Sequence, residues 1–75
     1  MTLRGRLGTS TTEVLSKGER QCMDLLGQGL RSKAIAQELG LATVTVELHL
    51  RNVRSKLGAT TRDQALLRYR SMFHG

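Results

Sequence analysis

A link of about three residues, 40–42, joins two helical patterns and limits how this chain can fold. It begins with Gly40, a residue that suits the left-handed conformation in which many helices end. The pattern after the link covers residues 43–57 and is stopped by Gly58. Its apolar side chains recur at gaps of four, three and four and predict one buried stripe: Val46, Leu50, Val53 and Leu57. Because so short a link permits only a steep reversal, we expect the two helices to form a helix-turn-helix.

A capping box predicts where an earlier helix begins. Ser16 and Glu19 stand three apart, so each side chain can accept from an amide that the helix start leaves free. The helix is expected over residues 17–28, and Gly29 is placed to cap its end.

Similar signals predict two further helices. Ser32 is the start signal of a short helix over residues 32–39. Thr61 and Gln64 repeat the capping-box spacing before a last helix over residues 62–72. The side chains of that helix and its end that are expected to face inward are Ala65, Leu66, Tyr69, Met72 and Phe73.

Four helices and no credible strand make the expected fold class all-α, a four-helix bundle with a central helix-turn-helix. The folded domain is expected over residues 15–73. Residues 1–14 have no sustained apolar period and are expected to form a flexible leader or linker.

Length and charge restrict the function. With 75 residues there is room for one domain and a small core. A net charge of +6 and a pI near 10.8 favour an anionic partner, either nucleic acid or a membrane surface. The chain has no Trp and a single Phe, which disfavours a membrane-surface helix. It also has neither a secretion signal nor an apolar run near the ~20 residues of a bilayer span, so a cytoplasmic protein is expected.

The reactive residue types give no sign of catalysis or metal binding. Cys22 stands alone among apolar neighbours and is expected to be a small buried hydrophobe. His49 and His74 lie 25 residues apart without further His or Cys ligands, so we expect no metal site and no cofactor. No glycine-rich phosphate loop or evident catalytic triad is present, and an enzyme is not expected.

The side of helix 43–57 opposite its stripe is polar and basic. Counted at about 100° per residue, its centre carries Val44, Leu48, Arg51 and Ser55. Glu47 and Arg54 lie on one flank, and Thr45, Asn52 and Lys56 lie on the other. Such a helix suits a groove lined with phosphates and base edges.

Over residues 15–67 the chain resembles the LuxR/FixJ-type helix-turn-helix domain, the DNA-binding output module of many bacterial quorum-sensing receptors and response regulators. The resemblance is carried in unbroken register by Leu15, Ser16, Glu19, Gly29, Leu30, Lys33, Ile35, Ala36, Leu39, Thr45, Val46, His49, Asn52, Lys56, Leu57, Gly58, Arg62 and Ala65.

This resemblance implies a partner, double-stranded DNA, with the third helix in the major groove. It also implies a homodimer on a two-fold site, and we count RNA polymerase as a further possible partner. The fourth helix is expected at the dimer contact, where Leu67 and Ser71 are the candidates. A lone exposed leucine needs no such role, so an ordinary surface position is equally expected for Leu67.

Base readout is assigned to four side chains. The resemblance places Glu47 and Arg51 toward base edges, and helix geometry adds Val44 and Leu48. A carboxylate can accept from the cytosine amino group, Arg suits guanine, and an apolar side chain suits the thymine methyl.

Contacts to the DNA backbone are expected on the flanks and at the start of the second helix. The resemblance implies them for Thr45, His49 and Asn52, while Lys33 stands beside free helix amides. For His49, packing against neighbouring backbone is as strong an expectation as a phosphate contact. The full predicted set is Ser32, Lys33, Thr43, Thr45, His49, Asn52, Arg54 and Lys56.

Three positions depart from the family pattern. Ser32 stands where the family generally has asparagine or another small polar residue, a mild change. Ala42 replaces a frequent serine cap, so Thr43 must cap the third helix or that helix starts less firmly. Glu47 stands where many members have Lys, which predicts an altered base preference rather than loss of binding.

Two alternatives stay open at this point. A basic helical adaptor could use the same surface to bind an acidic protein, with its cations merely solvated. A promoter-recognition region of a sigma-type subunit would share the helix-turn-helix.

Overall fold

The structure, a computed structural model, describes the backbone of residues 15–74 and the side chains of residues 15–72. Its four helices are α2 (Lys17–Gly27), α3 (Ser32–Leu39), α4 (Thr43–Leu57) and α5 (Arg62–His74), with no strand in this part of the chain. The all-α fold with a central helix-turn-helix is therefore confirmed. The expected leader, residues 1–14, and the expected inward position of Phe73 lie outside the described residues.

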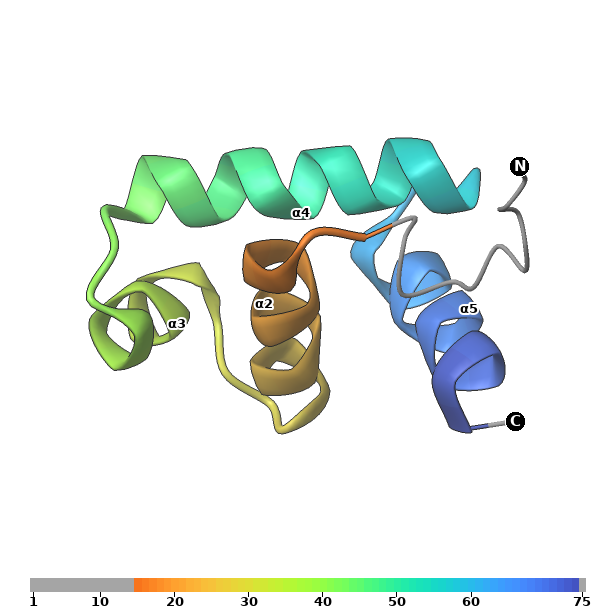
Figure 1. The fold of residues 1–75 in the computed structure, drawn as a ribbon, viewed down its shortest axis with the longest axis horizontal. Coiled ribbons are helices and arrows are strands. Elements are labelled where there is room, and N and C mark those ends of the chain that lie inside the picture. The colour runs from red at the N-terminus through yellow and green to blue at the C-terminus, as the bar shows by residue number, and fades with distance from the viewer. Residues whose placement is uncertain (1–14, 75) are drawn as a thin grey trace, which may run out of the picture.

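The longest helix, α4, packs on all three others, which lie along one side of it (Figure 1). These three helices cover the predicted stripe, whose members are all buried: Val46, Leu50, Val53 and Leu57. The other helices and the adjoining segments add the rest of the core: Leu15, Cys22, Met23, Ile35, Ala36, Ala59, Ala65 and Tyr69. Cys22 is fully buried, as expected for a small hydrophobe.

Glycines end three of the helices as predicted. The Leu30 amide donates to the Leu25 carbonyl and the Gly29 amide to that of Leu26, the paired bonds of a Schellman motif. Gly29, Gly40 and Gly58 all have positive φ, which a side chain would strain. The α2 helix itself ends at Gly27, one residue before the predicted end.

The predicted first residues of α2, α3 and α4 are confirmed, but of these three helices only α2 has a side-chain cap. The capping box of α2 is complete, because Ser16 and Glu19 each accept the other's amide. Ser32 is not a cap: it is the first residue of α3, and its cap, Arg31, makes no side-chain bond. Thr43 is likewise the first residue of α4, and Ala42 is an unassisted cap. The helix that carries the candidate contacts therefore starts less firmly, the second of the two expected outcomes.

The start of α5 follows the prediction in part. The Thr61 hydroxyl accepts from the Gln64 amide, as a capping box requires. The Gln64 side chain accepts from the amide and the hydroxyl of Thr60, whereas the spacing predicted the amide of Thr61.

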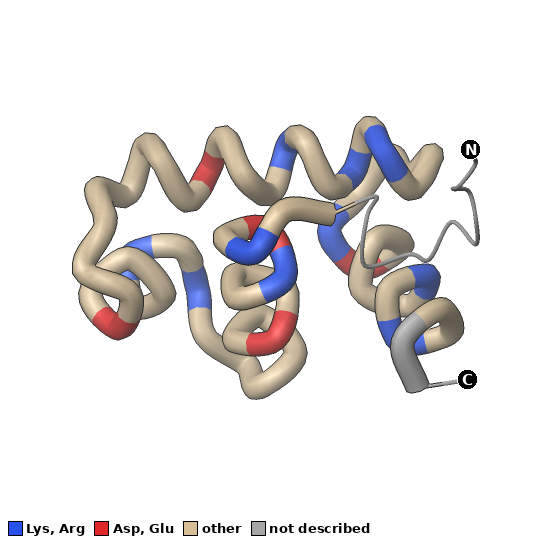
Figure 2. The backbone as a smooth tube through the Cα atoms, viewed as in Figure 1, with Lys and Arg blue, Asp and Glu red and all other residues tan. Residues whose placement is uncertain are grey.

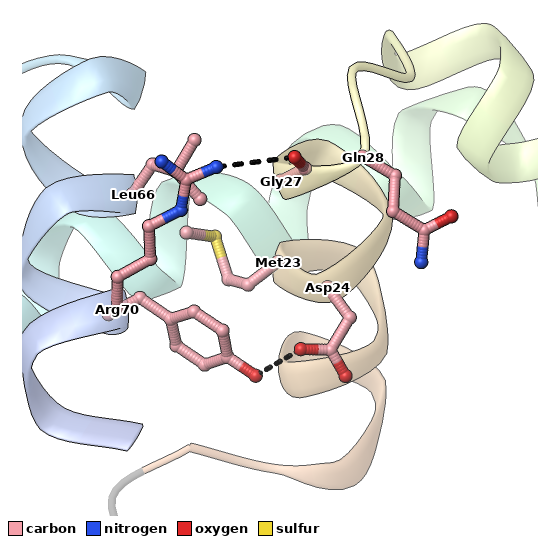
Figure 3. Close-up of a pocket in the computed structure, with 7 residues that line it drawn as sticks. Met23, Asp24, Gly27, Gln28, Leu66 and Arg70 are labelled. Carbon is pink, nitrogen blue, oxygen red and sulfur yellow. Dashed lines mark hydrogen bonds between the residues drawn. The ribbon is translucent and has the colours of Figure 1, made fainter. Parts of the chain in front are cut away.

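Two side chains of α5 fasten it to α2 across a hollow of about 360 Å³ (Figure 3). The Tyr69 hydroxyl donates to Asp24 at 2.5 Å, and the Arg70 guanidinium donates to the Gly27 carbonyl at 3.3 Å. Met72 was expected to face inward but is 39% exposed. It lies in the last turn of α5, where no other described helix covers it fully. The apolar spacing of α5 therefore continues one turn past the part of the helix that packs on its neighbours.

Candidate nucleic-acid interface

The outer face of α4 points away from the other three helices (Figure 1). All four side chains assigned to base readout are exposed there, Val44 at 74% and Leu48 at 51%. They line one shallow hollow of about 380 Å³, together with two predicted backbone contacts: Val44, Thr45, Glu47, Leu48, Arg51 and Arg54. The fold thus brings the predicted reading residues onto a single surface, and their contact with bases stays a prediction.

Charge on α4 is unevenly distributed along the helix (Figure 2). Its only acidic residue, Glu47, lies in the N-terminal half, and its cations Arg51, Arg54 and Lys56 lie in the C-terminal half. Cations near a helix C-terminus are favoured by the helix dipole, so this arrangement costs the helix nothing. The C-terminal half of α4 is therefore the basic part of the candidate interface, and the N-terminal half carries the acidic residue.

Thr45, His49 and Asn52 are all half-buried, and His49 lies against the start of α2. The His49 ring lies against Gly18, where an added methyl group would come within 3.0 Å of its Nε2 atom. A glycine inside the first turn of a helix costs up to about 1 kcal/mol against Ala. The structure gives the reason for it, since a glycine lets the ring of a candidate contact residue pack on the first turn of α2.

Lys56 lies on the same flank and is already paired. Its Nζ donates to Glu19 Oε1 at 2.8 Å, while its side chain keeps 39% exposure. Burial raises the pKa of Glu19, but the Lys56 ammonium, the Ser16 amide and the charge of His49 outweigh it and hold that pKa below its ordinary value. A phosphate would therefore share this ammonium with an internal carboxylate.

Glu47 is paired as well, and its partner, Arg62, was not predicted from the sequence. Arg62 Nη2 donates to both carboxylate oxygens, at 2.9 and 3.0 Å. Ser32 Oγ is buried and has no well-aligned hydrogen-bond partner among the described residues, yet it is close enough to Glu47 to favour the charged form of that carboxylate. The Ser32 hydroxyl and then the Arg62 guanidinium hold the pKa of Glu47 below its ordinary value, against an opposing effect of burial.

The remaining predicted contacts differ in accessibility. Lys33 and Thr43 are exposed and Arg54 is half-buried, whereas Ser32 is 6% exposed. A phosphate near Ser32 would meet the free backbone amides at the start of α3 more readily than the buried hydroxyl. Leu67, at 65% exposure, and Ser71 are both exposed on α5.

Two further observations concern other kinds of site. Within the described part of the chain, no three His, Cys, Asp or Glu side chains gather as a metal site would require. None of helices α2 to α5 is long and apolar enough to cross a membrane.

Comparison with known proteins identifies the fold. Residues 13–69 match the family described as bacterial regulatory proteins, luxR family. The chain belongs to the luxR family. A luxR-family chain is a helix-turn-helix DNA-binding domain of transcription regulators, and this assignment replaces the sigma-type alternative.

Individual relatives agree with the family match. The luxR-family chain is 44% identical over 66 residues to the probable HTH-type transcriptional regulator GfsR of Streptomyces halstedii, covering 87% of this chain and 27% of that protein. It is 41% identical over 70 residues to the transcriptional regulatory protein UhpA of Escherichia coli, covering 93% of this chain and 34% of that protein. The spore germination protein GerE of Bacillus subtilis is 41% identical over 54 residues, which cover 72% of this chain and 73% of GerE. The chain thus spans about a third or less of GfsR and UhpA.

Proposed function

We propose that this domain binds specific sequences of double-stranded DNA by placing α4 in the major groove. The observation that carries the proposal is the outer face of α4, where Val44, Glu47, Leu48 and Arg51 surround one hollow and face away from the core. The major groove of B-DNA is about 12 Å wide and admits a helix of this kind. We place the protein in the bacterial cytoplasm, with the DNA.

Affinity would come mainly from phosphate contacts on both flanks of α4 and at the start of α3. Lys33, Arg54 and Lys56 supply charge there, and Thr43, Thr45, His49 and Asn52 supply polar groups. Each neutralised phosphate releases counterions, so this part of the affinity falls as salt rises.

Base preference would come from the reading face. Arg51 can donate two hydrogen bonds to guanine, and Leu48 and Val44 offer apolar contacts to thymine methyl groups. Glu47 is ionised at neutral pH like an ordinary glutamate, its pKa being lowered further, and its carboxylate can accept from the amino group of cytosine.

We also propose that two copies bind one operator. Leu67 and Ser71 are exposed on α5, on the helix that the family resemblance places at the dimer contact. Two-fold pairing would set the half-sites about one helical turn apart. RNA polymerase is proposed as a further partner of the full regulator.

Selection of bound sequences from a random DNA pool, followed by a salt titration on the selected site, tests this function. A single enriched motif and a log-log salt slope of about −3 or steeper are expected from several phosphate contacts. Arg51→Ala should weaken specific binding by about 1 to 3 kcal/mol and relax one position. Arg70→Ala, which removes an equal charge at the hollow between α2 and α5, should leave the motif unchanged.

The adaptor alternative predicts the opposite results. An unenriched pool, a shallow salt slope and preferential binding to an acidic polypeptide would replace DNA recognition with protein recognition.

A further inference from the structure

Glu47 is held where three helices meet. It belongs to α4, its carboxylate accepts two bonds from Arg62 of α5, and the buried Ser32 hydroxyl of α3 lies beside it. Arg54, on the same flank of α4, adds a further positive charge nearby. A carboxylate on the reading face is therefore not a freely rotating group.

The pair does little for stability. Both side chains are well exposed, 39% for Arg62 and 46% for Glu47, and ion pairs with such exposure contribute little to folding. Arg62 is moreover the first residue of α5, where the helix dipole disfavours a cation. The pair is weak and its cation is unfavourably placed for the stability of α5. We therefore look for the effect of the pair on the surface where Glu47 lies.

On that surface the pair has two consequences. An isolated carboxylate would be repelled by phosphates, and the Arg62 charge offsets this repulsion. A carboxylate offers about four lone-pair sites, and the single Arg62 nitrogen uses one on each oxygen. Glu47 therefore keeps acceptor sites for a base while its position is fixed.

We propose that Arg62 is a positioning residue for sequence recognition, which holds the Glu47 carboxylate on the reading face and neutralises its charge so that it can accept from a cytosine amino group. The proposal rests on the proposed function, that α4 reads bases. It assigns part of the base preference to a residue of α5, outside the helix-turn-helix.

The test measures base preference rather than affinity alone. Selection first defines the operator of the unaltered protein and the position at which Glu47→Gln changes the base preference. The base pair at that position is then replaced by each of the other three. Binding of these four DNAs is then measured for the unaltered protein and for Glu47→Gln, Arg62→Gln, Arg62→Lys and the Glu47→Gln/Arg62→Gln double variant.

Arg62→Gln is expected to reduce the preference for cytosine by about fivefold or more, as Glu47→Gln does, because a good base contact discriminates by that amount. The double variant should lose no more preference than either single variant, since the two residues act as one unit. Arg62→Lys should restore part of the preference, because it returns the charge without the same geometry. Arg70→Gln, the same change on the same helix but directed at Gly27 of α2, should not alter the preference.

Three results would overturn the proposal. Arg62→Gln could keep the preference, it could raise it because the pair withholds Glu47 from DNA, or Glu47→Gln could change no position at all. In each case the unaltered protein would still select a DNA sequence, whereas failure of the proposed function would appear as no selection. Circular dichroism melts verify folding, and Arg62→Lys carries the test if Arg62→Gln unfolds.

Discussion

Lys56 Nζ lies 2.8 Å from Glu19 Oε1, the oxygen that also accepts the Ser16 amide at 3.0 Å. One carboxylate thus caps the first turn of α2 and holds the last turn of α4 against it. The Glu19 side chain is only 5% exposed, so this pair is screened less than the pair between Arg62 and Glu47.

The Glu19 contact predicts a specific loss of stability in acid. Because its folded pKa lies below the ordinary value of 4.5, its contribution is present above about pH 4.5 and is lost as pH falls through the lowered pKa. Glu19→Gln should cost about 1 to 2 kcal/mol at pH 7 and flatten the fall in acid, measured by urea unfolding between about pH 3 and 7. Glu38→Gln, an exposed position on α3, serves as the control, and an equal effect there would remove the special role of Glu19.

Tyr69 predicts a loss of stability in alkali. Burial, and then its bond to Asp24, raise the pKa of Tyr69 from 10.0 to about 12. A raised folded pKa means that the contribution is complete below about pH 10 and is lost as pH rises toward 12. Tyr69→Phe should lose about 1 to 2 kcal/mol at pH 7 and should lack this part of the alkaline fall. The difference between the two unfolding curves isolates the contribution of Tyr69, and parallel curves would contradict the assignment.

Ala42 predicts a stabilising substitution. Its backbone, at φ −73° and ψ 148°, has the extended conformation of a helix cap, but no side chain accepts from the first turn of α4. Ala42→Ser should therefore raise the free energy of unfolding by about 0.5 to 1 kcal/mol, measured in urea. Ala34→Ser, inside α3, should lower it by a few tenths of a kcal/mol instead. A gain at both positions would point to a general effect of serine rather than to capping.

Leu67 tests the proposed dimer. Leu67→Glu would place a charge in the contact, so affinity for an operator with two half-sites should fall by about tenfold or more. Affinity for a single half-site should not change, and sedimentation should show one protein copy on each DNA. Gln37→Glu, an exposed position on α3, controls for the added negative charge. Two copies of the Leu67→Glu variant on the operator would place the contact elsewhere.

Features encoded over a few residues could be predicted from the sequence. The stripe from Val46 to Leu57 follows from helical spacing, and the ends at Gly40 and Gly58 follow from the one residue type that adopts positive φ without strain. The reading face lies on the side of α4 opposite that stripe, so its exposure could be predicted too.

The pairs on the candidate interface could not be predicted in the same way. Glu19 and Lys56 are 37 residues apart, and Arg62 reaches Glu47 only because of the angle at which α5 leaves α4. Spacing along the chain carries no information on that angle, which side-chain packing decides. Neither Ser32 nor Thr43 caps its helix, since each is the first helical residue and the residue before it, Arg31 or Ala42, occupies the cap position.

The length of the exposed face of α4 limits how much sequence one domain can distinguish. From Val44 to Arg51 the helix rises about 10 Å, which matches about three base pairs at about 3.4 Å each. A three-base-pair word recurs by chance about once in 64 positions, so one domain alone would meet matching sites throughout a genome. Two such words at a fixed separation recur about once in 4,000 positions, so a second helix adds as much information as the first only where the separation between the two is fixed.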